Sequence, residues 1–410
     1  MTAAEVTGRK NMDMDSSGTV SCSRFGDSLQ SALVECSNEA LRCGQTLAYT
    51  ADIVMMRQLA SGTRIESKAE KSRLAMPGFF PGRVVAILHP GSLFENGFQA
   101  EPIKGMVESG MLSLTEAPDL TSAWSLFFER GDVVGIKVNL VGGPHLETCS
   151  ELLHEIVMGL ESAGVHRKDV VVFDRFHAQF LKRAFQQSLP EGVRWSFASE
   201  RFDRVQQAIE GYDPEHFMQM DLVLPGQDPC GLTPRRSYAA KFITKEVNKL
   251  INLPLLKDHQ SAGVSLALKN LSHGLMNNVH RSHSSRTVNV CGIFIPAAVS
   301  LPIIRNKAVL HILDGLKGLF HGGPTSHPQF VWPHQTLYFA TDPVALDRVC
   351  RAEIDKRRVA VGLNVVAEAE PDEFSVFVRR QPEHVEVAGA VGLGVWQESA
   401  TEVRSVTLGV

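Results

Sequence analysis

Residues 253–283 read LPLLKDHQSAGVSLALKNLSHGLMNNVHRSH and predict two consecutive pieces of structure. The first is a loop after a short apolar strand, PLLKDH, which carries Lys257 and His259. The second is a helix, because apolar residues recur at the spacing that a turn of about 100° per residue requires. Its apolar side holds Val264, Leu268, Leu271, Leu275 and Val279. Its polar side holds Lys269, Asn270, His273 and Asn277, and Gly274 predicts an end or a bend in the helix.

Short apolar runs alternate with helical patterns on both sides of this stretch. The expected strands are 83–88, 133–138, 170–173, 221–224, 250–253, 309–313 and 337–340, and the expected helices are 101–112, 120–129, 147–163 and 178–188. This alternation predicts an α/β fold, with a mostly parallel sheet covered by helices on both faces. Residues 1–75 are rich in Ser, Thr and charge, which predicts a partly disordered N-terminal extension before an α/β domain over 76–410.

The composition is that of an ordinary water-soluble protein. The chain has 44% hydrophobic and 21% charged residues and a formal net charge of −4, so the whole molecule has no polyanion-binding signature. Its seven cysteines form no C-x-x-C pair, which is typical of a reducing compartment rather than a disulfide scaffold. We find no apolar run long enough for a membrane span and no secretory signal pattern, so a cytoplasmic location is expected.

Positive charge and histidine are concentrated in a basic, His-rich lobe at about 230–335. Between Cys230 and Leu313 there are eleven Lys and Arg residues but only two acids, Glu246 and Asp258. Eight of the fifteen histidines lie between His259 and His334. A basic surface facing solvent is one interpretation. Nucleic acid binding is disfavoured, because the segment has little aromatic interleaving and no known module.

Polar residues follow several of the predicted strands, where ligands bind in parallel sheets. Lys137 and Asn139 alternate with apolar neighbours at one strand end, a usual pair for holding carboxylate or phosphate oxygens. Asp174 follows the next strand and is either functional or a cap for the following helix. Asp314 and Asp342 follow two later strands, and each has a structural alternative as a turn or an N-cap.

A divalent metal is an alternative occupant of this region. The candidate ligands are Asp314, Asp342 and His321, the last in an HGGP turn, and pairs of His273, His280 and His283 could share a helix face. None of these spacings has the specificity of a zinc motif. The chain contains no G-x-S-x-G, P-loop or G-x-G-x-x-G sequence, which removes the commonest hydrolase, NTPase and dinucleotide-binding interpretations.

Five segments, in order, resemble the family called domain of unknown function 362. They are GDVVGIKVNL (131–140), VVVFDRF (170–176), INLPLLKDHQSAGVSLALKNLSHG (251–274), HILDGLKGLFHGGP (311–324) and ATDPVALD (340–347). The resemblance implies an α/β fold and a polar centre of Lys137, Asn139, Lys257, His259, Lys269, Asn270, Asp314 and Asp342. Many relatives carry iron–sulphur modules or export signals. This chain has neither the cysteine clusters nor an N-terminal Arg-Arg signal, so no iron–sulphur cluster is expected on it.

The leading functional hypothesis is an enzyme that acts on a small anionic substrate, a carboxylate or a phosphate. Lys137, Asn139, Lys269, Asn270 and Asn277 would bind the anion. Lys257, His259, His273 and Asp174 would supply acid–base chemistry and orient it. The alternative is a non-catalytic metal- or ligand-binding protein that works beside a redox partner. A third possibility is a scaffold whose basic lobe docks an acidic protein.

Overall fold

The computed structural model describes residues 27–31, 34, 58–66, 72–95, 97–182 and 184–409. Most of the expected N-terminal extension, residues 1–75, lies outside the described residues, so its order is not addressed. Within it, β1 (Arg64–Glu66) pairs antiparallel with β8 (Tyr212–Gln219), which pairs antiparallel with β9 (Arg236–Ala240). These three strands form a small sheet of their own.

A ten-stranded mixed sheet forms the centre of the described structure. Its main path runs β15 (Glu402–Thr407), β2 (Arg83–Leu88), β14 (Val331–Ala340), β13 (Ala308–Leu319), β10 (Lys249–Asn252), β5 (Val134–Lys137), β6 (Val170–Phe173) and β7 (Arg194–Ser196). β11 (Leu255–His259) pairs parallel with β13 and antiparallel with β12 (Gly263–Val264). β14 is antiparallel to both of its neighbours, and the other pairings along the main path are parallel. The chain is therefore an α/β protein with a mostly parallel sheet, as predicted.

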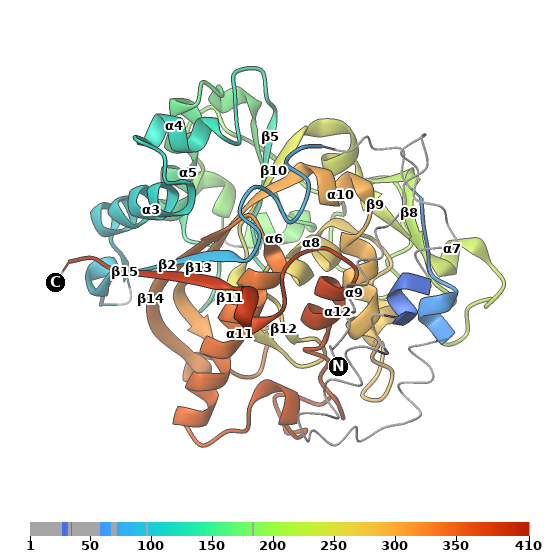
Figure 1. Cartoon of the computed structure of the whole chain (residues 1–410). Coiled ribbons are helices and arrows are strands. Elements are labelled where there is room, and N and C mark those ends of the chain that lie inside the picture. The colour runs from blue at the N-terminus through green and yellow to red at the C-terminus, as the bar shows by residue number, and fades with distance from the viewer. Residues whose placement is uncertain are drawn as a thin grey trace, which may run out of the picture.

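Helices cover both faces of this sheet. α3 (Ala100–Thr115), α4 (Leu120–Ser125) and α5 (Ser150–Ser162) pack on one face, and α8 (Leu266–Leu275), α9 (Cys291–Val299), α11 (Pro343–Ala360) and α12 (His384–Ala390) lie toward the other (Figure 1). The alternation of side chains along a strand explains the two faces. In β2, Val85 and Ile87 join the apolar cluster under α3, whereas Val84 joins the cluster under α11.

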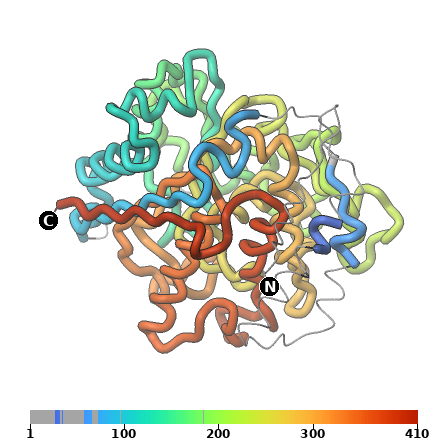
Figure 2. Tube along the Cα trace, in the orientation of Figure 1, coloured from blue at the N-terminus to red at the C-terminus, as the bar shows by residue number. Residues whose placement is uncertain are grey.

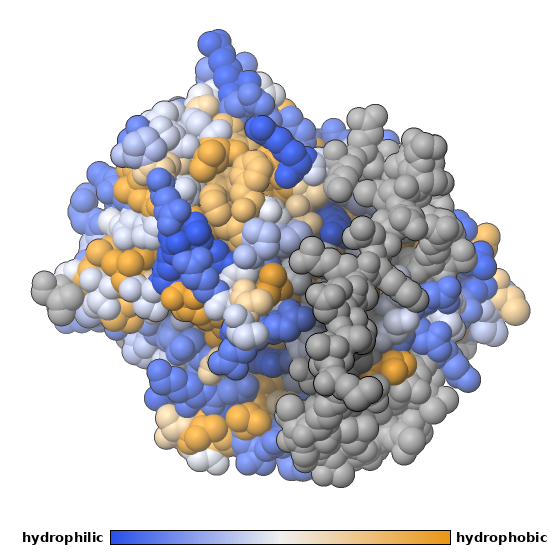
Figure 3. All heavy atoms as spheres, in the orientation of Figure 1, coloured by the Kyte–Doolittle hydropathy of each residue, from blue (hydrophilic) through white to orange (hydrophobic). Residues whose placement is uncertain are grey.

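The remaining elements are short. They are β3 (Leu93–Phe94), β4 (Gly97–Phe98), α6 (His177–Lys182), α7 (Leu232–Arg235) and α10 (Pro302–Lys307), with 3₁₀ helices that include η3 (Phe185–Ser188) and η5 (His280–His283). The C-terminal strand β15 runs parallel beside β2 (Figure 2). On the face shown in Figure 3, apolar residues of the described part form separate patches among hydrophilic ones. Within the described residues, no helix combines the length and apolar character that crossing a membrane requires.

Three local predictions were wrong. The strand expected at 221–224 is absent, and the chain instead forms β8 at Tyr212–Gln219, where Pro214 and the charged residues of YDPEHFMQ hide the strand pattern. PLLKDH is not a loop, because its LLKDH part is strand β11. The helix expected at 178–188 is two pieces, α6 and η3, separated by Ala184 with a positive φ of 51°.

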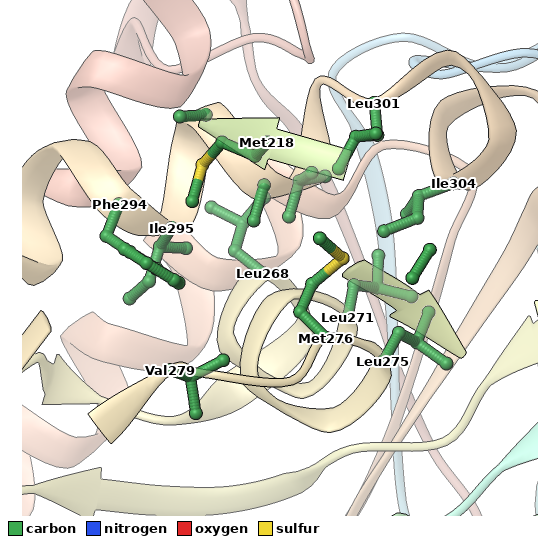
Figure 4. Close-up of a cluster of buried hydrophobic side chains, with 14 of the residues drawn as sticks. Met218, Leu268, Leu271, Leu275, Met276, Val279, Phe294, Ile295, Leu301 and Ile304 are labelled. Atoms are coloured by element: carbon green, nitrogen blue, oxygen red, sulfur yellow. The ribbon is translucent and has the colours of Figure 1, made fainter. Parts of the chain in front are cut away.

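The two-faced helix predicted after β11 is present as α8, although it is shorter than the pattern implied. Leu268, Leu271 and Leu275 point into a buried apolar cluster that also contains Met218 of β8 and Ile304 of α10 (Figure 4). Each of these three leucines is fully buried, and burying one leucine contributes about 1.5–3 kcal/mol. The apolar side therefore fixes the rotation of α8 and directs its polar side toward the ends of β5 and β11.

Candidate functional site

A pocket of about 180 Å³ lies where β5, β6 and β11 meet the polar side of α8. Its polar lining comes from Lys137, Asn139, Asp174, Arg175, Gln206, Lys257, His259, Ser265, Lys269, Asn270, His273, His280 and His283. The pocket lies at the carboxyl ends of parallel strands, which is where ligands bind in sheets of this kind. The pocket thus collects residues that are more than a hundred positions apart in the sequence.

Strand β11 sorts the three polar residues of LLKDH between two environments. Side chains alternate along a strand, so Lys257 and His259 share one side and line the pocket. Asp258 points to the other side, where it forms a fully buried ion pair with Arg380 at 3.0 Å. It also accepts a hydrogen bond from the Gly323 backbone N–H at 2.8 Å. The charge of Asp258, the residue between Lys257 and His259, is therefore neutralised by Arg380 outside the pocket.

Lys137 is held at the floor of the pocket by a network of hydrogen bonds. Its Nζ donates to Asp174 Oδ1 at 3.0 Å, to the Val138 carbonyl at 2.5 Å and to Asn270 Oδ1 at 3.3 Å. Burial lowers the pKa of Lys137, and the charge of Asp174 opposes that effect. Both side chains of the pair are almost fully buried. Lys137 and Asp174 therefore largely neutralise each other before any ligand binds.

Asparagines connect this floor to α8 and to Lys257. Asn270 Oδ1 accepts from Asn139 Nδ2 at 3.2 Å, and Asn139 Oδ1 accepts from Lys257 Nζ at 3.2 Å. Asn270 Nδ2 donates to Asn252 Oδ1 at 2.8 Å, and Asn252 Nδ2 donates to the Ala267 carbonyl at 3.1 Å. An amide can donate and accept at once, so it can link two such groups without adding charge.

Gly274 gives Lys137 the space it occupies under α8. A Cβ atom at this position would lie 2.4 Å from Lys137 Cε and 3.0 Å from its Nζ. Glycine in a helix costs about 1 kcal/mol relative to alanine. The close approach of the lysine explains why a residue that disfavours the helix stands one position before its end.

The pocket is strongly electropositive. Asp174 is the single carboxylate among its lining residues, against Lys137, Arg175, Lys257 and Lys269. Burial first, and the charge of Lys269 second, lower the pKa of Lys257 to about 7. Burial also lowers the pKa of Lys269 to about 8. Among the described residues, the Lys269 ammonium has no hydrogen-bond or ion-pair partner. A buried cation without an anion is energetically unfavourable.

Burial favours the neutral form of the histidines that line the pocket. Burial, with Lys269 as the next cause, holds the pKa values of His259, His273 and His283 well below the usual value. His259 Nδ1 lies 3.0 Å from the Ser261 hydroxyl, and its Nε2 has no hydrogen-bond partner among the described residues. By contrast, both ring nitrogens of His273 are engaged by serine hydroxyls. Unlike His273, His259 therefore keeps a ring nitrogen free for a ligand.

One group of residues in the described structure could hold a metal ion. The ligand atoms of His273, His283 and Cys291 all lie within 4.8 Å of one another. The Ser282 hydroxyl lies among them, 3.0 Å from His273 Nε2 and 2.8 Å from His283 Nδ1. Neutral imidazoles and a thiolate are ligands for zinc and similar metals. The nearby cations Lys269 and Arg175 oppose the binding of a further positive charge.

Comparison with known families agrees with this arrangement of segments. Residues 134–352, which is more than half of the chain, match the family described as Domain of unknown function (DUF362). The chain belongs to this family. A search of curated proteins found no match. The matched region contains β5, β6, β10, β11, α8, β13, β14 and the start of α11, and so it includes most of the pocket lining.

Four of the candidate site residues predicted from the sequence lie outside the pocket. Asn277 Oδ1 accepts from the Tyr238 backbone N–H at 2.6 Å and ties the end of α8 to β9. Asp314 accepts from the backbone N–H groups of Cys149 and Leu316. Asp342 caps α11 and also accepts from Gly82 and Val395. His321 pairs with Asp372 at 2.9 Å.

These four residues therefore have structural roles elsewhere in the fold. Asp314, Asp342 and His321 are not grouped with one another as metal ligands among the described residues. Each accepts or donates hydrogen bonds that join distant segments, which is a sufficient physical reason for a polar residue at a buried position. The helix-cap alternative for Asp342 is what the geometry shows.

Sequence reasoning missed several residues that shape the pocket. Arg175 was expected at a strand end beside Asp174 but was given no role, and it donates to the Tyr212 hydroxyl, the His273 carbonyl and Gln206. Asp347, the last residue of ATDPVALD, accepts from the Ala267 and Leu268 backbone N–H groups at 2.7 and 2.9 Å. Asp347 lies in α11 and thereby caps α8 from another helix. Ser265, the N-cap residue of α8, makes no side-chain capping bond. No local pattern could reveal a cap supplied from eighty residues away.

Proposed function

We propose that this DUF362 protein binds a small anion, a carboxylate or a phosphate group, and uses Lys257 as an acid–base group beside it. The observation that carries this proposal is the charge of the pocket. Lys257 has only an amide partner, Lys269 has no anionic partner among the described residues, and the sole lining carboxylate is committed to Lys137. An anion between Lys257 and Lys269 would supply the missing negative charge.

The roles of the individual groups follow from their charge states. Lys269 would bind the anion as a cation, with Asn139 and Asn270 orienting the neighbouring groups. Lys257, with a pKa of about 7, can both give and take a proton at physiological pH, which suits acid–base chemistry. His259 would contact the ligand through Nε2 as a neutral imidazole. The reaction class supported by these groups is proton transfer on a carbon or heteroatom next to the bound anion.

Isothermal titration calorimetry with acetate, sulfate and phosphate tests the binding step. Lys269→Met should weaken sulfate binding by about tenfold to a hundredfold, because a hydrogen bond to a charged group contributes about 1.5–3 kcal/mol. Methionine keeps the apolar stem and removes a buried charge, so the variant should fold. Lys104→Met, on the exposed side of α3, is the matched control and should leave the affinity unchanged. Equal affinity in Lys269→Met and the native chain would refute the proposal.

Metal binding by His273, His283 and Cys291 is a second candidate function, favoured by the proximity of their ligand atoms. Elemental analysis of the purified chain and zinc titration test it directly. Cys291→Ser should abolish stoichiometric metal if this group is the site, whereas Cys230→Ser, at an exposed position elsewhere, should not. We rank this function second, because Lys269 and Arg175 repel a cation and Ser282 already bonds to both imidazoles.

A further inference from the structure

The mouth of the pocket differs in chemistry from its floor. The floor is formed by lysines and amides, but the lining also contains Val141, Phe176, Phe202, Val279 and Pro324. Phe202 is 56% exposed and Val141 is 39% exposed, so apolar surface remains open beside the cavity. A ligand that is only a small inorganic anion would not contact this surface.

The Phe202 ring is available for contact with another ring. It lies 6.0 Å from the Phe176 ring and 6.4 Å from the His280 ring, and both arrangements are T-shaped. Among the described residues, no ring stacks in parallel on it. The Phe176 ring, in contrast, already has the guanidinium of Arg175 over it at 4.9 Å. Offset-stacked and edge-to-face pairs are the favoured arrangements of aromatic rings, so Phe202 can accept an aromatic group at the mouth.

We infer that the anion carries a single aromatic ring, which packs against Phe202 while the anionic group reaches Lys257 and Lys269. This inference rests on the proposed function and adds the class of ligand, a small aromatic acid or aryl phosphate. The size of the pocket agrees, because a cavity of about 150 Å³ holds a benzene molecule and this one is about 180 Å³. Larger ligands such as nucleotides need more room than that.

The orientation of such a ligand is set by charge. Arg175, Phe176 and Gln206 also line a second cavity of about 350 Å³. Its lining has three acidic residues, Glu200, Asp203 and Glu210, against two arginines, Arg175 and Arg201, so its net charge is negative. A carboxylate would be repelled there and attracted by the lysines of the first pocket. The ring is therefore the part of the ligand that remains at the mouth.

Calorimetry of the full chain with acetate, benzoate and cyclohexanecarboxylate tests the inference. Benzoate should bind about tenfold more tightly than acetate, and cyclohexanecarboxylate should bind more weakly than benzoate, because ring–ring geometry adds to burial. Phe202→Ala should lower the affinity for benzoate about tenfold and change the affinity for acetate by less than about twofold. Phe202→Leu keeps an apolar side chain and should lose the preference for benzoate over the saturated ring. Phe94→Ala, at a 66% exposed position in β3, is the control that should change neither.

The outcomes separate this inference from the proposed function. If acetate and benzoate bind with equal affinity to the native chain, or if Phe202→Ala leaves benzoate affinity unchanged, the aromatic ligand is refuted while anion binding stands. If none of the three acids binds and sulfate also fails to bind, the proposed function itself is refuted. A preference for benzoate that disappears in both Phe202 variants, with acetate binding preserved, supports the inference.

Discussion

Replacing Gly274 by alanine should destabilise the protein, although the same change favours an isolated helix. The added Cβ would lie 2.4 Å from Lys137 Cε, well inside van der Waals contact. Lys137 cannot move aside freely, because its Nζ donates to Asp174, Asn270 and the Val138 carbonyl. The helix cannot easily move either, because Asn252 fastens it to the sheet. The clash must therefore break part of the buried network.

The size of the effect follows from two opposing contributions. Alanine in place of glycine stabilises a helix by about 1 kcal/mol. Removing one partner from a buried ion pair costs about 3–5 kcal/mol, since the other charge stays buried without compensation. If the clash separates Lys137 from Asp174, the free energy of unfolding should fall by about 2–4 kcal/mol.

Gly105 provides a matched control for this substitution. It also lies inside a helix, α3, but a Cβ there would meet nothing within 4 Å. Gly105→Ala should therefore raise the free energy of unfolding by about 0.5–1 kcal/mol, the opposite sign. Urea unfolding of the native chain and both variants, followed by far-UV circular dichroism, measures the two changes. If Gly274→Ala is as stable as Gly105→Ala, the reasoning about Lys137 is wrong.

Three further predictions concern charge and capping. Lys257 loses its charge as the pH rises through its pKa of about 7, so sulfate affinity should fall by up to about tenfold per pH unit above that value. Calorimetry at a series of pH values measures this fall, and Lys257→Met should make the affinity less dependent on pH in that range. Asp347→Ala leaves two backbone N–H groups of α8 uncapped and should lower the free energy of unfolding by about 1–3 kcal/mol, with Asp347→Asn recovering part of the loss. Arg380→Met leaves the buried Asp258 carboxylate without its ion-pair partner, so the free energy of unfolding measured in urea should fall by about 3–5 kcal/mol. A fall below about 1 kcal/mol would contradict the buried ion pair.

Much of the fold was predictable because each buried strand is itself apolar. Arg83–Leu88 and Val170–Phe173 were predicted with the bounds that the structure has. Strand β8 was missed because polar and charged residues interrupt its apolar pattern, although Asp213 and His216 among them are buried. Apolar periodicity therefore identifies the apolar strands of the central sheet better than a buried strand that carries polar residues.

The candidate site was predictable to the extent that it follows the strand ends. Lys137, Asn139 and Asp174 were found because they directly follow predicted strands, and they line the pocket. Asp314 also directly follows a predicted strand, but in the structure it accepts hydrogen bonds from the backbone of Cys149 and Leu316. A strand end selects positions near the edge of the sheet, but it does not decide which way a side chain points. That choice depends on pairings such as β11 with β13, which connect segments far apart in the sequence.

Strand β11 shows how one short sequence supplies both the charge of the pocket and the stability of its wall. In LLKDH the pleat separates Lys257 and His259 from Asp258, so the carboxylate cannot neutralise the adjacent lysine. Had the segment been a loop, the aspartate could have turned toward the pocket and paired with Lys257. The strand instead binds Asp258 to Arg380 on its far side and leaves Lys257 with an amide partner alone. The lowered pKa of Lys257, and with it the proposed acid–base role, is therefore a consequence of strand geometry as much as of residue type.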